Sequence, residues 1–433
     1  MSKLCDIEAR SRYHVGGWKL HAFHILWCFF SLFATQSLAQ DAVDGRYFGM
    51  HIHNAASGTR WPDVPVGSWR LWDANVNWPD LQPAADRWDF SHLDLYVGMA
   101  GVVKTELLLP LGLSPAWASS RPREHSSYSP GNAAEPRSIE DWNRYVATVA
   151  RRYKGKIAAY EIWNEPNADG FFSGDVDAMV KLACSAYKII KQVDPRALVV
   201  SPAATSQARG VAWLDRFIAH GGKGCFDVVG FHFYTLAHEP PEAMLPLVEQ
   251  VRSVLATHGL SSLEIWNTES GWIIKNAHRP VGVPWHTLND DEAAAYVGRA
   301  LMLGWSSGLR RFYWYAWDDG SYGLMEPEDG SLKKAAIAYR NTVRWILGAQ
   351  SLACATRDTH LMVCKMDKSG ERSWIIWSLE GERSFNIPND WKVSTQEMLV
   401  GNSAVLKPGE VIMVGQMPKL LQGTVQHSID GNK

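Results

Sequence analysis

The sequence predicts an α/β protein, a (β/α)8 TIM barrel followed by a small C-terminal antiparallel β-sandwich domain. Between residues 47 and 347, short apolar runs alternate with helical patterns, which is typical of βαβ units around a parallel sheet. Eight such apolar runs occur, the number that a (β/α)8 barrel requires. Beyond residue 347 the pattern changes to a period of two residues, which indicates a separate β-domain.

The predicted barrel strands are short apolar segments, and the helices between them have recognisable ends. Ser138 followed by Glu140 and Asp141 predicts a helix start, because a serine oxygen can accept from a free backbone N–H group. Asp194-Pro195 predicts a helix end, since proline cannot continue a helix. The predicted strands cover residues 48–53, 68–72, 105–109, 157–163, 198–201, 228–233, 263–267 and 311–317.

Four segments follow from these patterns. Residues 40–347 are expected to form the barrel, and residues 348–418 the β-sandwich, with turn signals between its strands. Residues 419–433 are polar and are expected to form a flexible tail. Residues 1–39 are expected to lie outside the fold.

The N-terminal segment has the pattern of a secretory leader. Four basic residues precede an apolar run from Ile25 to Ala34, and Ser37-Leu38-Ala39 places small residues where a signal peptidase cleaves. The run is short for a membrane span of about 20 residues, although an uncleaved N-terminal membrane anchor is the alternative. Both forms predict a periplasmic or secreted protein. The uncleaved form would anchor it to the inner membrane, and any membrane association is expected through this segment only.

The composition excludes some partners and raises the prospect of others. A formal net charge of −2 over 433 residues provides no basic surface for nucleic acid. The apolar content of 46% and charged content of 20% are those of a globular protein. The 21 tryptophans are unusual, and their flat rings either fill the core or stack on sugars.

Four cysteines follow the leader, and they fit an oxidising compartment. These are Cys184, Cys225, Cys354 and Cys364, which allow three pairings. Cys354 and Cys364 lie near each other in a predicted hairpin, so a disulfide between them is plausible. The sequence has no cysteine and histidine spacing typical of zinc. We expect no metal and no cofactor.

Two similar segments carry the strongest functional signal. Tyr160–Asn167 and Glu264–Trp272 each contain an apolar strand that ends near an asparagine and a carboxylate. Cleavage of a glycosidic bond needs two carboxyl groups, one to protonate the leaving oxygen and one to attack the anomeric carbon or activate water. We therefore predict Glu165 as acid/base and Glu269 as nucleophile, about 5–5.5 Å apart. A structural ion pair is the alternative for Glu165.

Other polar and aromatic residues lie at the predicted carboxyl ends of strands, where barrel active sites are built. Arg70 is expected to hold Glu269 ionised, with an ordinary ion pair as an equal alternative. Tyr234 is expected to donate to Glu269, and His51 and His53 are weaker candidates because alternate strand residues point to opposite faces. The predicted substrate-binding set is Asn164, Arg70, His53, Trp117, His232, Tyr234, Trp272 and Trp317, with the three tryptophans facing a groove.

These motifs resemble those of clan A, the large barrel clan of retaining glycosidases. Asn164-Glu165-Pro166 and Thr268-Glu269 carry that resemblance, and two further segments, Phe90–Asp94 and Pro110–Ala118, are similar to glycoside hydrolase family 39. The resemblance implies hydrolysis with net retention, and the roles given above for the two carboxylates. Family 39 includes β-xylosidases, α-iduronidases and endoglycosidases of bacterial exopolysaccharides.

With its leader, the chain looks most like the bacterial exopolysaccharide (Psl-type) endoglycosidases. The expected function is therefore an extracytoplasmic retaining glycosidase, endo-acting on such a polysaccharide. The alternatives are an exo-acting β-xylosidase-like glycosidase, a transglycosylase, and a non-catalytic glycan-binding barrel in polysaccharide export. The presence of both carboxylates favours an enzyme. The expected partner is a polysaccharide or oligosaccharide, and no nucleic acid.

Overall fold

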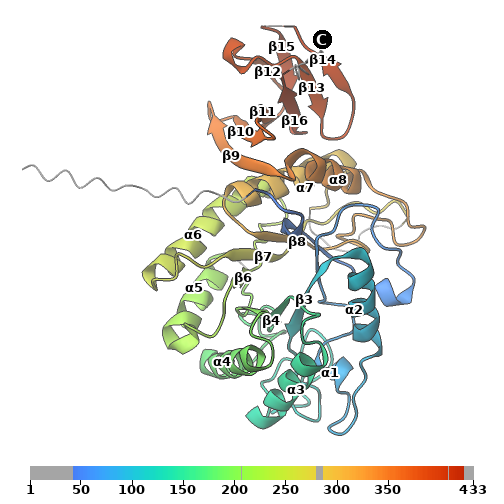
Figure 1. Ribbon diagram of the computed structural model, residues 1–433, viewed down its shortest axis with the longest axis vertical. Helices are drawn as coiled ribbons and strands as arrows, with labels where there is room; N and C mark the ends of the chain where they lie inside the picture. The colour runs from blue at the N-terminus through green and yellow to red at the C-terminus, as the bar shows by residue number, and fades with distance from the viewer. Residues whose placement is uncertain (1–41, 206, 279–285, 408, 424–433) are drawn as a thin grey trace, which may run out of the picture. The chain divides into compact units, whose positions relative to one another are not determined.

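The computed structural model describes residues 42–205, 207–278, 286–407 and 409–423 (Figure 1). The leader predicted over residues 1–39 lies outside these ranges. Within the described ranges, none of the helices is both long and apolar enough to cross a membrane.

A nearly closed barrel of eight parallel strands forms the larger part of the fold (Figure 1). The strands lie in the order β5-β4-β3-β2-β1-β8-β7-β6, and an isolated parallel bridge between Val200 and Val228 joins the two ends of the sheet. The predicted barrel is therefore confirmed. Its strands are β1 (Phe48–His51), β2 (Ser68–Arg70), β3 (Glu106–Leu111), β4 (Ala159–Ile162), β5 (Leu198–Val200), β6 (Val229–Phe231), β7 (Ile265–Ser270) and β8 (Arg311–Trp314).

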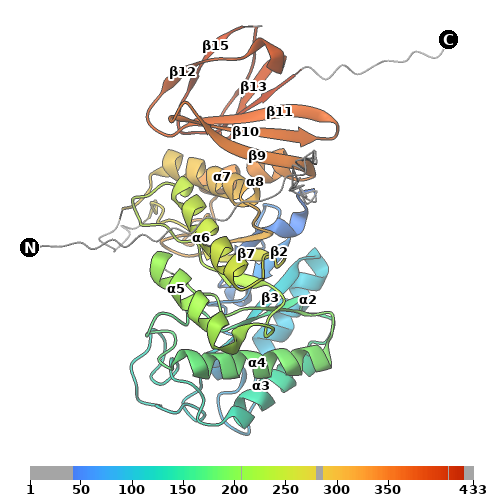
Figure 2. The ribbon, with the colours of Figure 1, turned by 90° about the vertical axis from the view of Figure 1, so that its left-hand side faces the viewer.

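Helices surround the barrel, and local sequence determines several of their ends (Figure 2). The Ser138 side chain begins α3 by accepting a hydrogen bond from the Glu140 amide, as predicted. Asn289 and Glu292 form a reciprocal capping box at the start of α7. The helices are α1 (Trp78–Leu81), α2 (Ser91–Val103), α3 (Ile139–Arg152), α4 (Val176–Val193), α5 (Gln207–Phe217), α6 (Met244–Thr257), α7 (Asp290–Ser306) and α8 (Lys334–Ile346).

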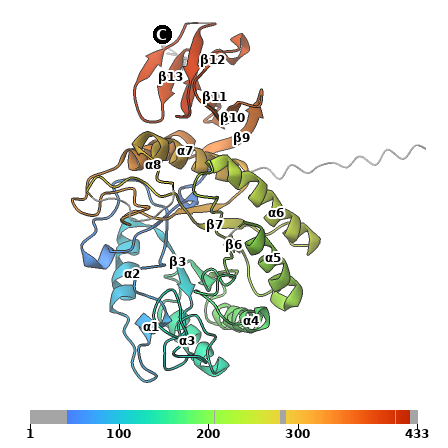
Figure 3. The ribbon, with the colours of Figure 1, turned by 180° about the vertical axis from the view of Figure 1, so that it is seen from behind.

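The C-terminal domain is an antiparallel β-sandwich, as predicted (Figure 3). One sheet has the order β14-β13-β16-β11-β10-β9, and β12 pairs with β15 in the other. Residues 419–422, predicted as the start of the flexible tail, instead form β16 between β13 and β11. The predicted tail beyond residue 423 lies outside the described residues. The strands are β9 (Ala349–Arg357), β10 (Leu361–Lys368), β11 (Glu371–Ser378), β12 (Arg383–Asn386), β13 (Thr395–Met398), β14 (Ser403–Val405), β15 (Val411–Val414) and β16 (Lys419–Gln422).

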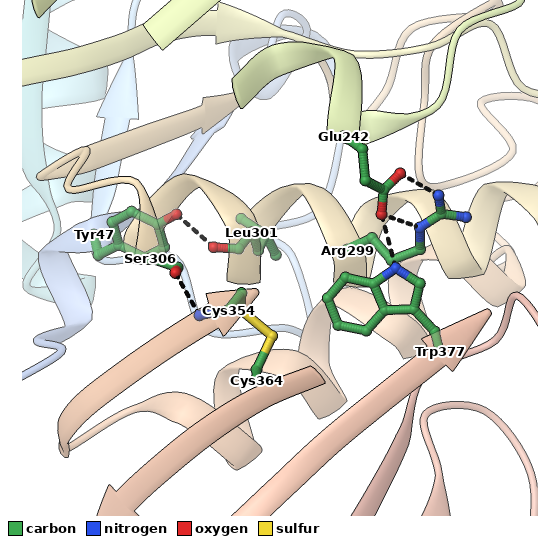
Figure 4. The surroundings of a disulfide bond; sticks show 8 residues. All are labelled: Tyr47, Glu242, Arg299, Leu301, Ser306, Cys354, Cys364 and Trp377. Atoms are coloured by element: carbon green, nitrogen blue, oxygen red, sulfur yellow. Dashed lines mark hydrogen bonds and ion pairs between the residues drawn. A yellow bond between two sulfur atoms is a disulfide. The ribbon is translucent and has the colours of Figure 1, made fainter. Parts of the chain in front are cut away.

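Helix α7 connects the barrel to the β-domain through polar contacts (Figure 4). Glu242, just before α6, accepts hydrogen bonds from Arg299 Nε of α7 at 3.0 Å and from Trp377 Nε1 of β11 at 2.7 Å. The Cys354 amide of β9 donates to Ser306 Oγ at 2.8 Å. Arg299 is only 1% exposed, so Glu242 compensates a charge that would otherwise be costly to bury. The β-domain is thus packed directly on the barrel.

Two disulfides stabilise different parts of the chain. Cys354 and Cys364 face each other on β9 and β10 and are bonded, as the hairpin predicted (Figure 4). Cys184 of α4 is bonded to Cys225, which precedes β6. This second bond ties a helix to the segment that leads into a barrel strand.

Removal of the two disulfides is expected to have unequal effects on stability. The Cys184–Cys225 bond closes 41 residues and the Cys354–Cys364 bond closes 10. By loop-closure entropy these bonds contribute about 4 and about 3 kcal/mol. In urea unfolding, Cys184→Ser/Cys225→Ser should therefore lose more stability than Cys354→Ser/Cys364→Ser. The reverse order would show that strand pairing, and not chain entropy, dominates.

Candidate active site

Glu165 and Glu269 lie at the carboxyl ends of β4 and β7, and the barrel brings them together. One oxygen of each carboxyl group and a ring nitrogen of His232 lie within 4.8 Å of one another. The two side chains are largely buried, with 13% and 9% of their surfaces exposed. Two carboxyl groups at this distance in a buried site cannot both ionise easily, because like charges repel.

Arg70 organises the site from the end of β2. Its guanidinium donates to Glu269 Oε2 at 2.8 Å, to Glu161 Oε2 at 2.6 Å and to Asn164 Oδ1 at 2.7 Å. Arg70 and Glu161 are fully buried, so each charge depends on the other for compensation. The predicted contact between Arg70 and Glu269 is present, and Glu161 is part of the same network.

The backbone at the end of β4 leaves the regular strand conformation. Trp163 and Glu165 have φ values of 65° and 46°, the left-handed region that side chains other than glycine rarely adopt. The Glu165 amide donates to the Ala203 carbonyl at 2.9 Å, and the Trp163 amide to the Leu111 carbonyl at 2.7 Å. Hydrogen bonds to both neighbouring strand ends therefore hold a strained conformation, which is common at functional sites.

His232 connects the two carboxyl groups from the end of β6. Its Nε2 lies 3.5 Å from Arg70 Nη2, and a guanidinium can only donate. Nε2 is therefore the acceptor, and Nδ1 carries the proton and donates to Glu165 Oε1 at 2.9 Å. Burial lowers the pKa of His232 to about 4, so the ring is neutral at neutral pH.

Burial raises the pKa of both carboxyl groups. The pKa of Glu165 rises to about 7, and that of Glu269 also rises to about 7, where the Arg70 charge opposes the rise and the Glu165 charge adds to it. Arg70 and the Tyr234 hydroxyl, at 3.1 Å, both donate to Glu269, and such bonds favour the ionised form. Glu165 accepts from the neutral His232 ring and not from a cation, so we expect the first proton bound by the pair to lie on Glu165.

The three predicted tryptophans pack against protein. Trp272 is 4% exposed and lies against Tyr296 and Trp314, and Trp317 is 2% exposed. Trp117 lies edge-on to Trp78 and beneath the Arg144 guanidinium of α3. Trp117 is partly exposed, and the predicted place of all three tryptophans in a sugar-binding groove stays a prediction. Large indole rings suit the core as well as a sugar, so composition alone could not separate the two uses.

The two histidines of the first strand differ in their surroundings. His51 is fully buried, and its Nε2 lies 3.1 Å from the Thr268 carbonyl. The His53 ring lies 4.9 Å from the Tyr315 ring, and its backbone amide donates to Asp318. The His51 ring also lies against Tyr315, with 5.1 Å between the ring centroids. The predicted role of His53 in substrate binding stays a prediction.

An aspartate and several tyrosines at this end of the barrel were missed by the sequence reasoning. Asp73 follows β2, and it accepts hydrogen bonds from Tyr128 and Tyr315. Tyr322 lies 5.6 Å from the Tyr315 ring. The rule that barrel sites form at strand ends would have singled out Asp73 and Tyr315, because each lies just beyond a strand.

Glu165, His232 and Glu269 also have the composition of a metal site. Their proximity is explained without an ion, since His232 donates to Glu165 while Arg70 and Tyr234 donate to Glu269. Arg70 already supplies the positive charge that a cation would bring. No role for a metal is inferred from this cluster.

A cavity of about 1010 Å³ lies over the β-domain and the end of α8, and it contains neither carboxyl group of the pair. Its cations are largely engaged. Arg372 pairs with Asp367, Arg344 pairs with Glu397, and Lys368 donates to carbonyl groups at the end of α8. This cavity is not the candidate active site.

A parallel eight-stranded barrel with paired carboxyl groups at the carboxyl ends of its fourth and seventh strands defines a class, the barrel glycosidases. The family model of the glycosyl hydrolases family 39 matches residues 81–305, a range that contains both carboxylates. The chain therefore belongs to family 39 of the glycosyl hydrolases, the retaining glycosidases that hydrolyse O-glycosyl compounds.

Solved structures with the same fold include two that cover 89% of this chain. A family 39 glycoside hydrolase from Bacteroides cellulosilyticus WH2 superposes with a TM-score of 0.69 at 18% identity, over 82% of its own length. A monomeric beta-xylosidase from Caulobacter crescentus CB15 has a TM-score of 0.62 at 17% identity, over 98% of its length. At these identities the likeness concerns the fold alone.

A curated relative shares a shorter stretch of sequence. Over 86 residues the chain is 36% identical to the beta-xylosidase of Caldicellulosiruptor saccharolyticus. That stretch is 18% of this chain, and the chain spans only 18% of the relative's length.

Proposed function

We propose that this protein is a retaining glycosidase in which Glu165 is the acid/base and Glu269 the nucleophile. The observation that carries the proposal is the proximity of the two carboxyl groups, with one oxygen of each within 4.8 Å of one oxygen of the other. A direct attack by one carboxylate needs a separation of about 5–5.5 Å, whereas inversion needs about 6.5–9.5 Å to admit a water molecule. The separation supports a covalent route.

The reaction proceeds in two steps, and Glu165 transfers the proton in both. Glu165 protonates the glycosidic oxygen while a Glu269 oxygen bonds to the anomeric carbon, and the bond from that carbon to the leaving oxygen breaks. Glu165, now ionised, takes a proton from water, the water oxygen bonds to the same carbon, and Glu269 is released. Asn164 Oδ1 accepts from Arg70 at 2.7 Å, and we propose that Asn164 binds the sugar 2-hydroxyl group.

The activity is expected to have a bell-shaped pH dependence centred near neutral pH. The reaction needs Glu269 ionised, so activity falls as pH drops, and it needs Glu165 protonated, so activity falls as pH rises. Burial raises both pKa values to about 7, and repulsion spreads the pair into two steps. The pH profile of kcat/KM measures them. An acid limb at the ordinary glutamate pKa would contradict a buried nucleophile.

For the substrate we propose a bacterial exopolysaccharide, cleaved internally, outside the cytoplasm. The leader pattern of residues 1–39 and the two disulfides support a periplasmic or secreted location. Anchoring to the inner membrane through the same segment is part of this proposal. The resemblance of the motifs to exopolysaccharide endoglycosidases supports the polymer substrate.

An exo-acting β-xylosidase is a second candidate with at least equal support. A stretch of 36% identity to a beta-xylosidase favours it. The two candidates share the same carboxylates and mechanism, and they differ in whether the site accepts a chain interior or only a terminal sugar.

Digestion of bacterial exopolysaccharides and aryl β-glycosides, with products followed by size, tests these proposals. Early release of oligosaccharides from a polymer is expected for the endo-acting enzyme. Release of monosaccharide alone from small glycosides would establish the exo-acting alternative. Measurable glycan binding with no cleavage of any substrate would overturn the enzymatic proposal and favour a glycan-binding barrel.

A further inference from the structure

Asp73 is held at the rim of the site by groups from two other loops. Tyr128 Oη donates to Asp73 Oδ1 at 2.5 Å, and Tyr315 Oη donates to Oδ2 at 2.8 Å. Tyr128 belongs to the loop after β3, and Tyr315 follows β8 directly. Asp73 has a φ of 56°, in the left-handed region. The loops after β3 and β8 thus hold the carboxylate of Asp73, whose own backbone lies in a region that side chains other than glycine adopt uncommonly.

The charge of Asp73 is within electrostatic reach of the catalytic pair. It contributes to the raised pKa values of Glu165 and Glu269, although burial is the larger cause. Among the described residues, no lysine, arginine or histidine forms an ion pair with Asp73. A carboxylate of this kind opposes the ionisation of the nucleophile Glu269, while it helps to keep the acid Glu165 protonated.

Substrate binding provides a role for the unpaired charge of Asp73. A carboxylate has about four lone-pair sites, and each Asp73 oxygen has accepted one hydrogen bond from a tyrosine. The side chain is only partly buried, so each oxygen can accept a second bond from a ligand hydroxyl group. Burial raises the pKa of Tyr128 and of Tyr315 far above 10, so both phenols remain donors and keep the carboxylate oriented.

We propose that Asp73 binds sugar hydroxyl groups beside the reacting bond and selects an uncharged sugar over a uronate. Two adjacent hydroxyl groups of a neutral sugar can donate to its two oxygens, as charge-assisted bonds. A sugar carboxylate in the same place would meet a like charge without a compensating cation. The proposal rests on the proposed glycosidase function and adds the chemical class of the sugar.

Asp73→Asn tests the proposal against a matched pair of substrates, 4-nitrophenyl β-glucoside and 4-nitrophenyl β-glucuronide, with 4-nitrophenyl β-xyloside as a third. The variant is expected to lose kcat/KM on the neutral substrates by about 10–100-fold. The ratio of glucoside to glucuronide turnover should fall by about tenfold. The basic limb of the pH profile should move to lower pH, because one carboxylate that opposes ionisation of Glu165 is gone.

Asp86→Asn, which changes an exposed aspartate between α1 and α2, is the matched control. An equal loss on all substrates with both pH limbs unmoved would overturn the proposal and leave Asp73 a purely structural residue. Binding of the same glycosides to Glu269→Gln and to Asp73→Asn/Glu269→Gln, by calorimetry, separates the two hypotheses. If Glu269→Gln binds the neutral glycosides more tightly than the glucuronide, and Asp73→Asn removes that difference, the role of Asp73 is supported. This result would stand even if wild type cleaves no substrate and the proposed function fails. Equal binding by the two variants would overturn it.

Discussion

Glu269→Ala is expected to lower kcat on an aryl glycoside by about 10⁵-fold, since no covalent glycosyl-enzyme can form without the attacking carboxylate. Azide should restore part of the activity, because a small anion can enter the space left by the side chain. The glycosyl azide should have the anomeric configuration opposite to that of the substrate, since azide attacks only once. Proton NMR of the product measures this.

The complementary variant, Glu165→Ala, separates the two roles. Its loss of activity should be large for a poor leaving group and small for 2,4-dinitrophenolate, which departs without protonation. Azide should here give a product of retained configuration, since it attacks the glycosyl-enzyme. Glu106→Gln is the matched control. Glu106 is the first residue of β3, at the end of the strand opposite to the active site, and it pairs with Arg311. Rescue with the two configurations exchanged would reverse the assignment.

Arg70→Met is expected to lower the free energy of unfolding by about 3–5 kcal/mol, because it leaves Glu161 as a buried charge without its partner. Arg70 and Glu161 are both fully buried, with 2.6 Å between Arg70 Nε and Glu161 Oε2. The loss of the Arg70 charge should also raise the pKa of Glu269 further, so that the acid limb of the pH profile moves to higher pH. Urea unfolding and the profile of kcat/KM measure the two effects.

A second variant distinguishes the sources of these effects. Arg70→Met/Glu161→Gln removes the uncompensated charge, and it should recover much of the stability without recovering activity. The contact between Arg70 and Glu269 is lost in both variants, so the acid limb should move to higher pH in both. The move should be smaller in the double variant, because the nearby Glu161 charge is also gone. An Arg70→Met variant as stable as wild type would contradict the assigned charge balance.

Much of the fold could be predicted because barrel sequences follow a simple rule. Apolar runs alternate with helices, and cap residues such as Ser138 and Asn289 begin helices through contacts within a few residues of themselves. The two carboxylates could be predicted for a related reason. A parallel barrel places the carboxyl ends of all its strands on one face, so Glu165 and Glu269 had to be neighbours once the eight strands were assigned.

Only the tertiary structure determined how each side chain is used at the carboxyl ends of the barrel strands. Residues beyond a strand end leave regular backbone conformation, as Glu165 and Asp73 do with positive φ, and periodicity then no longer gives the direction of the side chain. The use of Trp272 in packing and the place of β16 in its sheet depend on partners distant in sequence. Burial, which raises the pKa of Glu165 to about 7, is likewise a property of the assembled barrel. The sequence by itself determined the fold and the pair of carboxylates, and the long-range contacts determined their charge state and their surroundings.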